Sequence, residues 1–239
     1  MIINLFSLPV YKVNILDQID TSTLEEKLQF EFSRSSANIS DLEKNGGVST
    51  YNTNCNLHLE EYSKTISNIV LQHARLYWKI LDVDPRLEPR IDQCWSNIHY
   101  NNSVTIEHSH SLYPIVATLY VSAEENSGNL VLINPMEYGL THIPYGVPIE
   151  NKTETAIKVS TGDLVLFPGW VRHKTKENLS NRSRVVMSFN INYDGKYLSS
   201  NSDYLVDHTV HTSEIDHLQN KILKLEFIID HMKRSLKNE

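Results

Sequence analysis

The feature that most constrains the fold is a change of hydrophobic period at residue 92. Beyond it, apolar and polar residues alternate in short runs, and Gly, Pro, Asn or Asp bounds each run. A period of two is typical of strands, and short strands separated by turns pair antiparallel. The chain is therefore expected to be mainly β, as an antiparallel sandwich or barrel. The predicted strands are residues 92–100, 104–110, 115–122, 129–133, 155–159, 163–167 and 183–193.

Before residue 90 the pattern is mostly helical. Ser22 and Glu25 form a capping box, which predicts a short helix to about Phe32. Apolar residues at spacings of three and four predict an amphipathic helix over residues 58–81. One further strand is expected at residues 4–15. We therefore expect one pair of sheets with flanking helices packed on an outer face.

The C-terminal segment, residues 206–239, carries a different repeat. Its apolar residues recur at alternating spacings of three and four, which is the seam of a coiled coil. They are Ile215, Leu218, Ile222, Leu225, Ile229, Met232 and Leu236. This amphipathic helix either packs on its own domain or forms a short coiled coil that makes a homodimer. The predicted division is thus a β domain at residues 1–205, with its N-terminal strand and helices, and a helix at 206–239.

Composition argues against several classes of protein. The formal net charge of −7 disfavours a nucleic-acid partner, since binding a phosphate backbone needs a concentrated basic face. No apolar run approaches the roughly 18 residues of a membrane span, and the N-terminus lacks the features of a signal peptide. Cys55 and Cys94 are too few for a disulfide framework. These observations predict a cytoplasmic protein without a membrane partner, in which eleven histidines are more than composition requires.

Two of these histidines stand one residue apart in IEHSHSLYPIVATLYV, residues 106–121. In a strand, residues i and i+2 point to the same face, about 6 to 7 Å apart. His108 and His110 would therefore share one face and could bind one metal ion, while Glu107 would point away. The alternative is a pair of structural or exposed histidines, so the metal interpretation needs a third ligand.

The third ligand is expected from TGDLVLFPGWVRHKT, residues 161–175. A tight turn, a buried strand and a second turn at Pro168-Gly169 precede His173. A barrel would bring a histidine on such a late strand opposite the first pair. Eleven residues further on, Arg184 lies near the start of the predicted strand 183–193, and its guanidinium fork suits a carboxylate bidentately.

Together these motifs resemble the Fe(II)/2-oxoglutarate-dependent dioxygenase superfamily, and more narrowly the 2OG-Fe(II) oxygenase family of marine bacteria and phages. The resemblance rests on LFSLPVY at the start, Trp95-Ser-Asn97-Ile, HSH before IVATLYV, the G-D-L-V-L-F-P stretch before His173, and SRVVMSFN. These motifs cover most of residues 4–193 in the same order, and the C-terminal segment lies outside the resemblance.

The resemblance implies a double-stranded β-helix, a cupin-like jelly roll, within residues 1–205. It implies that the core holds Fe(II) with 2-oxoglutarate chelated to it, and that Arg184 pairs with the far carboxylate of the keto acid. The chain would be a dioxygenase, an oxidoreductase that hydroxylates a small-molecule or peptidyl substrate and releases succinate and CO2. The metal ligands would be His108, His110 and His173, and no other catalytic side chain is expected.

The first departure from the superfamily is His110, which stands where a carboxylate ligand is usual. Three interpretations remain open. In the first, all three histidines are metal ligands. In the second, only two are ligands, and His110 supports one of them or contacts the cosubstrate. In the third, a remote Asp or Glu binds the metal, or the site is inactive. Three neutral imidazoles leave Fe(II) at +2, which a dianionic cosubstrate would balance, so the exchange does not forbid the chemistry.

The second departure is Val186, since many relatives place a hydroxyl two residues after the arginine. Ser188 or Tyr113 could bind the cosubstrate carboxylate instead. Arg182 and Arg172 are the alternatives to the predicted arginine, and the register of the strand decides between them.

Three further residues share one face of the predicted strand 92–100. Asn97 is expected to bind the cosubstrate, whereas Trp95 and His99 are expected to line the substrate pocket, with core packing as the alternative for Trp95. Two other functions remain open. One is a cupin-like three-histidine metal dioxygenase that does not use 2-oxoglutarate, and the other is a non-catalytic binding or scaffold barrel.

Overall fold

The computed structural model describes residues 8–35, 42–137, 153–194, 196–198 and 205–207. Two antiparallel sheets dominate this part of the chain. The larger has the order β1-β9-β6-β11-β4-β3 and the smaller the order β10-β7-β8. The strands of the larger sheet are β1 (Tyr11–Asn14), β3 (Val48–Ser49), β4 (Glu88–His99), β6 (Ile115–Ser122), β9 (Asp163–Pro168) and β11 (Arg184–Asp194). Those of the smaller are β7 (Leu130–Ile133), β8 (Glu154–Ile157) and β10 (His173–Thr175).

The remaining elements are short, apart from two helices. Two small pairs, β2 (Glu43–Lys44) with β5 (Val104–Thr105) and β12 (Lys196–Leu198) with β13 (Leu205–Asp207), stand outside the main sheets. The helices are α1 (Thr21–Ser35) and α2 (Lys64–Ile80), with single 3-10 turns η1 (Leu16–Gln18), η2 (Leu57–Leu59) and η3 (Glu61–Ser63). Among the described residues, no helix is long and apolar enough to cross a membrane.

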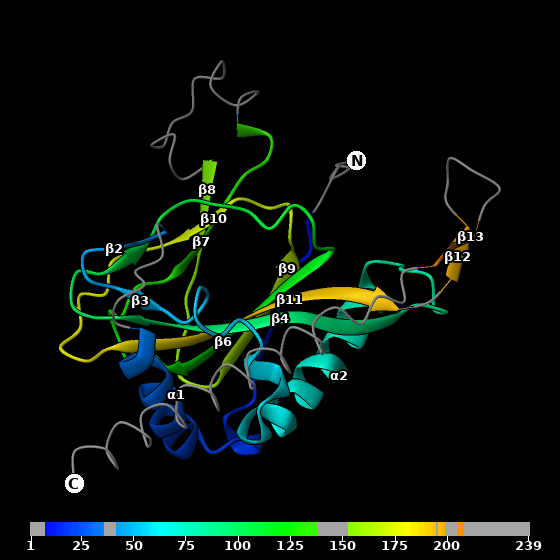
Figure 1. Cartoon of the computed structure of the whole chain (residues 1–239). Helices are drawn as coiled ribbons and strands as arrows, with labels where there is room; N and C mark the ends of the chain where they lie inside the picture. The colour runs from blue at the N-terminus through cyan, green and yellow to red at the C-terminus, as the bar shows by residue number, and fades with distance from the viewer. Residues whose placement is uncertain (1–7, 36–41, 138–152, 195, 199–204, 208–239) are drawn as a thin grey trace, which may run out of the picture.

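Alternation along the strands separates two apolar clusters. On β11, Val185, Met187 and Phe189 join the larger cluster, in which α1 and α2 pack on the outer face of the six-stranded sheet. Figure 1 shows both helices on that side, away from β7, β8 and β10. The smaller cluster joins β6, β7 and β9 between the two sheets, with Tyr120 and Leu132 among its members. The predicted mainly β fold with helices on an outer face is confirmed.

The inner face of the larger sheet is polar where β11 and β4 pair. Their register sets Arg184 opposite His99, and two residues further along each strand it sets Val186 opposite Asn97. The next inward pair is Ser188 and Trp95. Because side chains alternate in a strand, all of them point to the side that faces the small sheet. This register places Arg184, the arginine predicted from the sequence, within the pairing of β11 with β4.

Several predicted boundaries are wrong. The helix expected over 58–81 is helical only over Lys64–Ile80, and two 3-10 turns precede it. Asp20, not Ser22, caps α1, because its Oδ1 accepts bonds from the N–H groups of Ser22 and Thr23. The strand expected at 104–110 ends at Thr105.

The two ends of the predicted domain division are only partly described. Residues 4–7 of the predicted first strand lie outside the described residues, and β1 covers Tyr11–Asn14. The predicted C-terminal helix, 206–239, lies outside them from residue 208 onward. Residues 206 and 207 belong to β13, which pairs with β12. The helix expected beyond them stays a prediction.

Candidate active site

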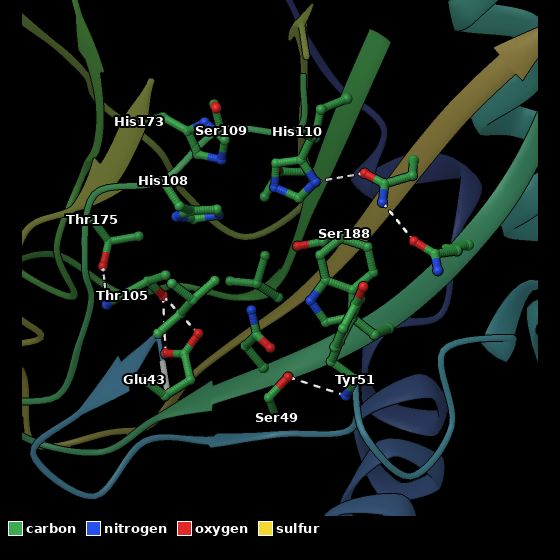
Figure 2. Close-up of a pocket in the computed structure, with 18 of the residues that line it drawn as sticks. Glu43, Ser49, Tyr51, Thr105, His108, Ser109, His110, His173, Thr175 and Ser188 are labelled. Carbon is green, nitrogen blue, oxygen red and sulfur yellow. Dashed lines mark hydrogen bonds between the residues drawn. The ribbon is translucent and has the colours of Figure 1, made fainter. Parts of the chain in front are cut away.

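A cavity of about 660 Å³ lies on the inner face of the larger sheet. Its wall includes the inward side chains of β4 and β11, which are Gln93, Trp95, Asn97, His99, Val186, Ser188 and Asn190. His108, His110 and His173 line it as well (Figure 2). Among the described lining residues Glu43 is the only acidic one, and none is Lys or Arg. The cavity is thus a mixed polar and aromatic pocket with little formal charge.

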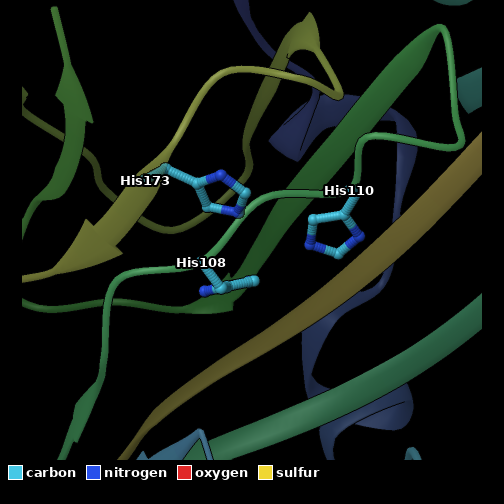
Figure 3. A group of neighbouring side chains, drawn as sticks. All are labelled: His108, His110 and His173. Atoms are coloured by element: carbon cyan, nitrogen blue, oxygen red, sulfur yellow. The ribbon is translucent and has the colours of Figure 1, made fainter.

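The three predicted metal-binding histidines lie together in this cavity. One potential ligand atom of each lies within 4.8 Å of one of each of the others. The segment 108–110 runs beside the segment 169–173, because His108 and His173 exchange both backbone hydrogen bonds, at 3.0 and 2.8 Å. The N–H of His110 donates to the carbonyl of Gly169 at 2.7 Å. Figure 3 shows the rings turned toward a common space.

Each of the three rings is held through its Nδ1 atom. Nδ1 of His108 lies 2.9 Å from the carbonyl oxygen of Ile106, and Nδ1 of His173 lies 2.9 Å from that of Val171. Nδ1 of His110 lies 2.7 Å from Oδ1 of Asn190. An oxygen acceptor at each Nδ1 requires a proton there, so every Nε2 keeps its lone pair. That lone pair is what a metal ion needs.

Asn190 is a positioning residue that the sequence did not single out. Two of the rings are fixed by the carbonyl two residues before them, whereas His110 depends on a side chain from β11. Nδ2 of Asn190 donates to Oε1 of Gln93 at 2.8 Å, which fixes the amide with its oxygen toward the ring. Partners of this kind fix the tautomer of a metal-binding histidine.

Burial keeps these imidazoles neutral. Removal from water lowers the pKa of His110 to about 4 and that of His173 to about 3, and the neighbouring His108 adds to both shifts. Burial also lowers the pKa of His108, although Ile106 and Glu43 oppose it. Because only the neutral ring binds a metal ion, all three are ready to act as ligands at neutral pH. The nitrogen donor set suits Fe(II) as well as other borderline metal ions.

Nearby carboxylates have other partners. Glu107 points away from the cavity, as expected, and forms an ion pair with Arg172 at 2.6 Å. The buried carboxylate of Glu43 accepts bonds from the hydroxyl of Thr105 and lies 2.7 Å from Nε2 of His99. Among the described residues, the histidine triad is the group whose ligand atoms converge. This geometry favours the three-histidine interpretation over entry of a remote acid.

Aromatic side chains wall the cavity beside the triad. Trp95 stacks on His110 with ring centroids 5.6 Å apart and planes 14° from parallel. Tyr51 meets Trp95 edge-on at 5.1 Å. Trp95 therefore both packs against a candidate ligand and faces the space where a substrate would lie, so the two roles weighed for it are compatible.

Arg184 is completely buried, with 0% of its surface exposed, and does not itself line the cavity. Nη1 donates to the carbonyls of Ser127 and Gly128 at 2.6 and 2.8 Å, and Nη2 donates to Oγ1 of Thr175 at 3.0 Å. Nε has no partner. Gly128 is required there, because a Cβ at this residue would lie 2.5 Å from Nη1 and the φ angle is +89°.

The alternative arginines are engaged elsewhere. Arg182 lies at the surface and pairs with Glu124 at 3.1 Å, while Arg172 pairs with Glu107 and Glu137. The register of β11 therefore directs only Arg184 of these three toward the interior. Thr175, two residues after His173, joins Arg184 to the cavity wall, and the sequence gave no reason to select it.

The other predicted contact residues line the same cavity. Asn97 has an unpartnered Oδ1, and Ser188 lies between Asn190 and Val186 on the same strand face. The hydroxyl of Tyr113 donates to Oε1 of Gln93 at 3.2 Å. His99 is held by Glu43 and Thr105, which places it deep in the wall. Glu43 lies in the short strand β2, and the sequence pattern gave no reason to select it.

Comparison with known proteins gives one family. Residues 93–190 match the model of a family described as putative 2OG-Fe(II) oxygenases. This segment contains the three histidines and Arg184. A search of curated proteins finds no match to the chain.

Solved structures share the fold. SnoK, a non-heme alpha-ketoglutarate-dependent carbocyclase from nogalamycin biosynthesis, has a TM-score of 0.56 at 10% identity, covering 80% of this chain and 82% of that chain. A prolyl-4-hydroxylase of Pseudomonas putida has a TM-score of 0.50 at 12% identity, covering 80% and 96%. At these identities the likeness establishes the fold alone, a double-stranded β-helix.

Proposed function

We propose that the chain is an Fe(II)- and 2-oxoglutarate-dependent oxygenase that hydroxylates a small-molecule or peptidyl substrate from a three-histidine iron centre, as the family match over residues 93–190 and the shared fold support. The observation that carries the proposal is the convergence of His108, His110 and His173, each with Nδ1 engaged and Nε2 free. When bound, Fe(II) and 2-oxoglutarate supply the oxidising chemistry, in which dioxygen is reduced, the keto acid leaves as succinate and CO2, and a substrate C–H bond is hydroxylated.

The protein's part is to hold the reactants and to exclude water. The three neutral rings bring no charge to the metal, so the charge of Fe(II) is left for the dianionic cosubstrate to balance. Arg184, with Thr175 in front of it, provides a cationic end for the far carboxylate of that cosubstrate. Its unpartnered Nε, lying beside a bonded Nη2, is the edge of a guanidinium that grips a carboxylate.

The remaining wall residues divide by position. Asn97, Ser188 and Tyr113 present polar groups where cosubstrate would lie, and Thr175 supplies the hydroxyl that Val186 does not. Trp95 and Tyr51 form an apolar rim that shields the triad and contacts the substrate. A cavity of about 660 Å³ is within the range that encloses a small ligand or one residue of a peptide.

The choice of substrate class follows the neighbours. SnoK is a carbocyclase of nogalamycin biosynthesis, whereas the Pseudomonas putida protein is a prolyl-4-hydroxylase. A natural product and a prolyl residue are therefore the two substrate classes to consider. Both classes fit a pocket that contains one acidic residue and neither Lys nor Arg among its described lining residues. The homodimer and the cytoplasmic localisation stay predictions.

An anaerobic titration tests the proposal. Fe(II)-loaded protein should develop a weak metal-to-ligand charge-transfer band in the visible when 2-oxoglutarate is added, saturating at one equivalent per chain, because chelation by a keto acid produces that band. Acetate at the same concentration is the control and should give none. If iron binds but the band fails to appear, a metal dioxygenase that does not use 2-oxoglutarate is favoured. Failure to bind Fe(II) or Mn(II) would instead favour a non-catalytic barrel.

A further inference from the structure

A buried cluster of three polar side chains, Glu43, His99 and Thr105, lies beside the histidine triad. The hydroxyl of Thr105 donates to both oxygens of Glu43, at 3.0 and 2.9 Å. Nε2 of His99 lies 2.7 Å from Oγ1 of Thr105 and 2.7 Å from Oε2 of Glu43. Figure 2 shows Glu43 and Thr105 on the cavity wall beside His108. Glu43 is 4% exposed and His99 is 1% exposed, so the cluster is shielded from water.

The positions of the protons in this cluster follow from which atoms can only accept hydrogen bonds. The single hydrogen of the Thr105 hydroxyl goes to the carboxylate, so Nε2 of His99 must be the donor to both oxygens. The neutral ring then keeps a bare lone pair on Nδ1. This atom is buried and has no hydrogen-bond partner among the residues that the structure describes. A buried ring nitrogen without a partner is costly unless a ligand or a proton satisfies it.

His99 stands directly opposite Arg184 in the pairing of β4 with β11. Nε of Arg184 is likewise buried without a partner. Oγ1 of Thr175 accepts bonds from Nη2 of Arg184 and from the N–H of Thr105, so its own hydrogen is left to donate elsewhere. His99 and Arg184 are therefore cross-strand neighbours, each with a buried nitrogen that has no hydrogen-bond partner among the described residues, and Thr175, bonded to Arg184, keeps a hydrogen to donate.

The charges at this end of the cavity balance before any ligand binds. Arg184 on β11 carries a positive charge and Glu43 on β2 a negative one, while Thr105 on β5 and Thr175 on β10 are neutral. Tyr120 on β6 is neutral too, since burial raises its pKa to about 12. Since Fe(II) would lie at the chelating end of the cosubstrate, a carboxylate that entered this end would add a buried negative charge with no local counter-charge, which is strongly unfavourable.

We propose that His99 takes up a proton as the far carboxylate of 2-oxoglutarate binds, and becomes a second cationic contact beside Arg184 with Glu43 as its counter-ion. The inference rests on the proposed function and assigns His99 to the cosubstrate instead of the substrate. Burial and the charge of Arg184 hold the pKa of His99 below its usual value in the free protein, so the ring starts neutral. An added carboxylate opposes both effects and favours the protonated ring.

Calorimetry counts the proton directly. 2-Oxoglutarate is titrated into Mn(II)-loaded protein at pH 8 in buffers of low and high ionisation enthalpy, such as phosphate and Tris. The observed heat should depend on the buffer with a slope of about one proton taken up per ligand. The matched ligand is 2-oxobutyrate, which has the same chelating end and lacks the far carboxylate. It should bind with no proton uptake.

Two variants test whether the proton taken up on binding goes to the cluster of Glu43, His99 and Thr105. His99→Gln should abolish the uptake and weaken 2-oxoglutarate binding by about tenfold or more, because the charge of Glu43 then opposes the ligand. Adding Glu43→Gln to that variant should restore most of the affinity, without proton uptake. Metal affinity and melting temperature, measured on the same samples, identify any loss that comes from misfolding.

The outcomes separate the two levels of inference. Binding of 2-oxoglutarate by the loaded wild-type protein with no buffer dependence would overturn the role of His99 and leave the proposed function standing. Equal uptake with 2-oxobutyrate would also overturn it, since the proton would then belong to the metal end. If neither keto acid bound to metal-loaded protein, both the inference and the proposed function would be refuted.

Discussion

His173→Ala should reduce the affinity for Fe(II) or Mn(II) by more than about 100-fold, which is beyond the effect of losing a partner behind a ligand. The variant removes one of three convergent nitrogens and leaves two, which hold a metal ion poorly. Its backbone bonds to His108 do not depend on the side chain, so the fold should persist. Metal affinity can be measured by competition with a fluorescent chelator, alongside the melting temperature of the metal-free protein.

The matched control is His73→Ala, which changes a histidine on α2 whose Nδ1 bonds the hydroxyl of Tyr11. This residue lies outside the cavity, so metal affinity should be unchanged. Equal loss of metal in the two variants would show that the effect is not specific to the triad. Unchanged binding in His173→Ala would remove this residue from the ligand set.

Arg184→Ala should weaken 2-oxoglutarate by roughly 100-fold or more while metal affinity changes little, since two charge-assisted hydrogen bonds contribute about 1.5–3 kcal/mol each. It should also lower the free energy of unfolding by roughly 3–5 kcal/mol, because the carbonyls of Ser127 and Gly128 lose their donor. Calorimetric affinity for the keto acid and chemical denaturation measure the two effects separately.

Two companion variants guard against a loss of fold. Arg184→Lys keeps the charge but not the fork, so it should be intermediate in both measurements. Arg182→Ala changes an exposed arginine two residues earlier that pairs with Glu124, and should alter neither. Should Arg184→Lys bind 2-oxoglutarate as tightly as the wild type while folding normally, the arginine would have no role in holding the far carboxylate.

Strand parity predicted that His108 and His110 lie together, and the structure brings them together in a different way. The strand expected at 104–110 stops at Thr105, so simple alternation does not direct the rings. Instead, backbone bonds hold His108 against His173 and His110 against Gly169. A Cβ at Gly169 would lie 2.6 Å from the carbonyl oxygen of His110, which explains the glycine in the turn before His173. Alternation of residues in the sequence indicates the direction of side chains only where the segment is paired with another strand.

Residues from distant parts of the chain could not be found from the sequence. Asn190 shares the parity of Arg184, but its contact with His110 depends on how 80 residues of chain fold between them. Glu43 reaches the cavity through the short pair of β2 with β5. Thr175 is relevant only because its hydroxyl accepts a hydrogen bond from the guanidinium of Arg184. Local patterns predict elements and faces, whereas these contacts depend on the register between elements.

The central claim is that His110 is an iron ligand in place of the usual carboxylate. X-ray absorption spectroscopy on anaerobic Fe(II)-loaded protein measures it most directly, because imidazole rings give a distinctive outer-shell scattering. We predict three imidazole ligands in the wild-type protein, with and without 2-oxoglutarate, and two in His110→Ala. Two imidazoles in the wild type, unchanged in His110→Ala, would contradict the three-histidine centre.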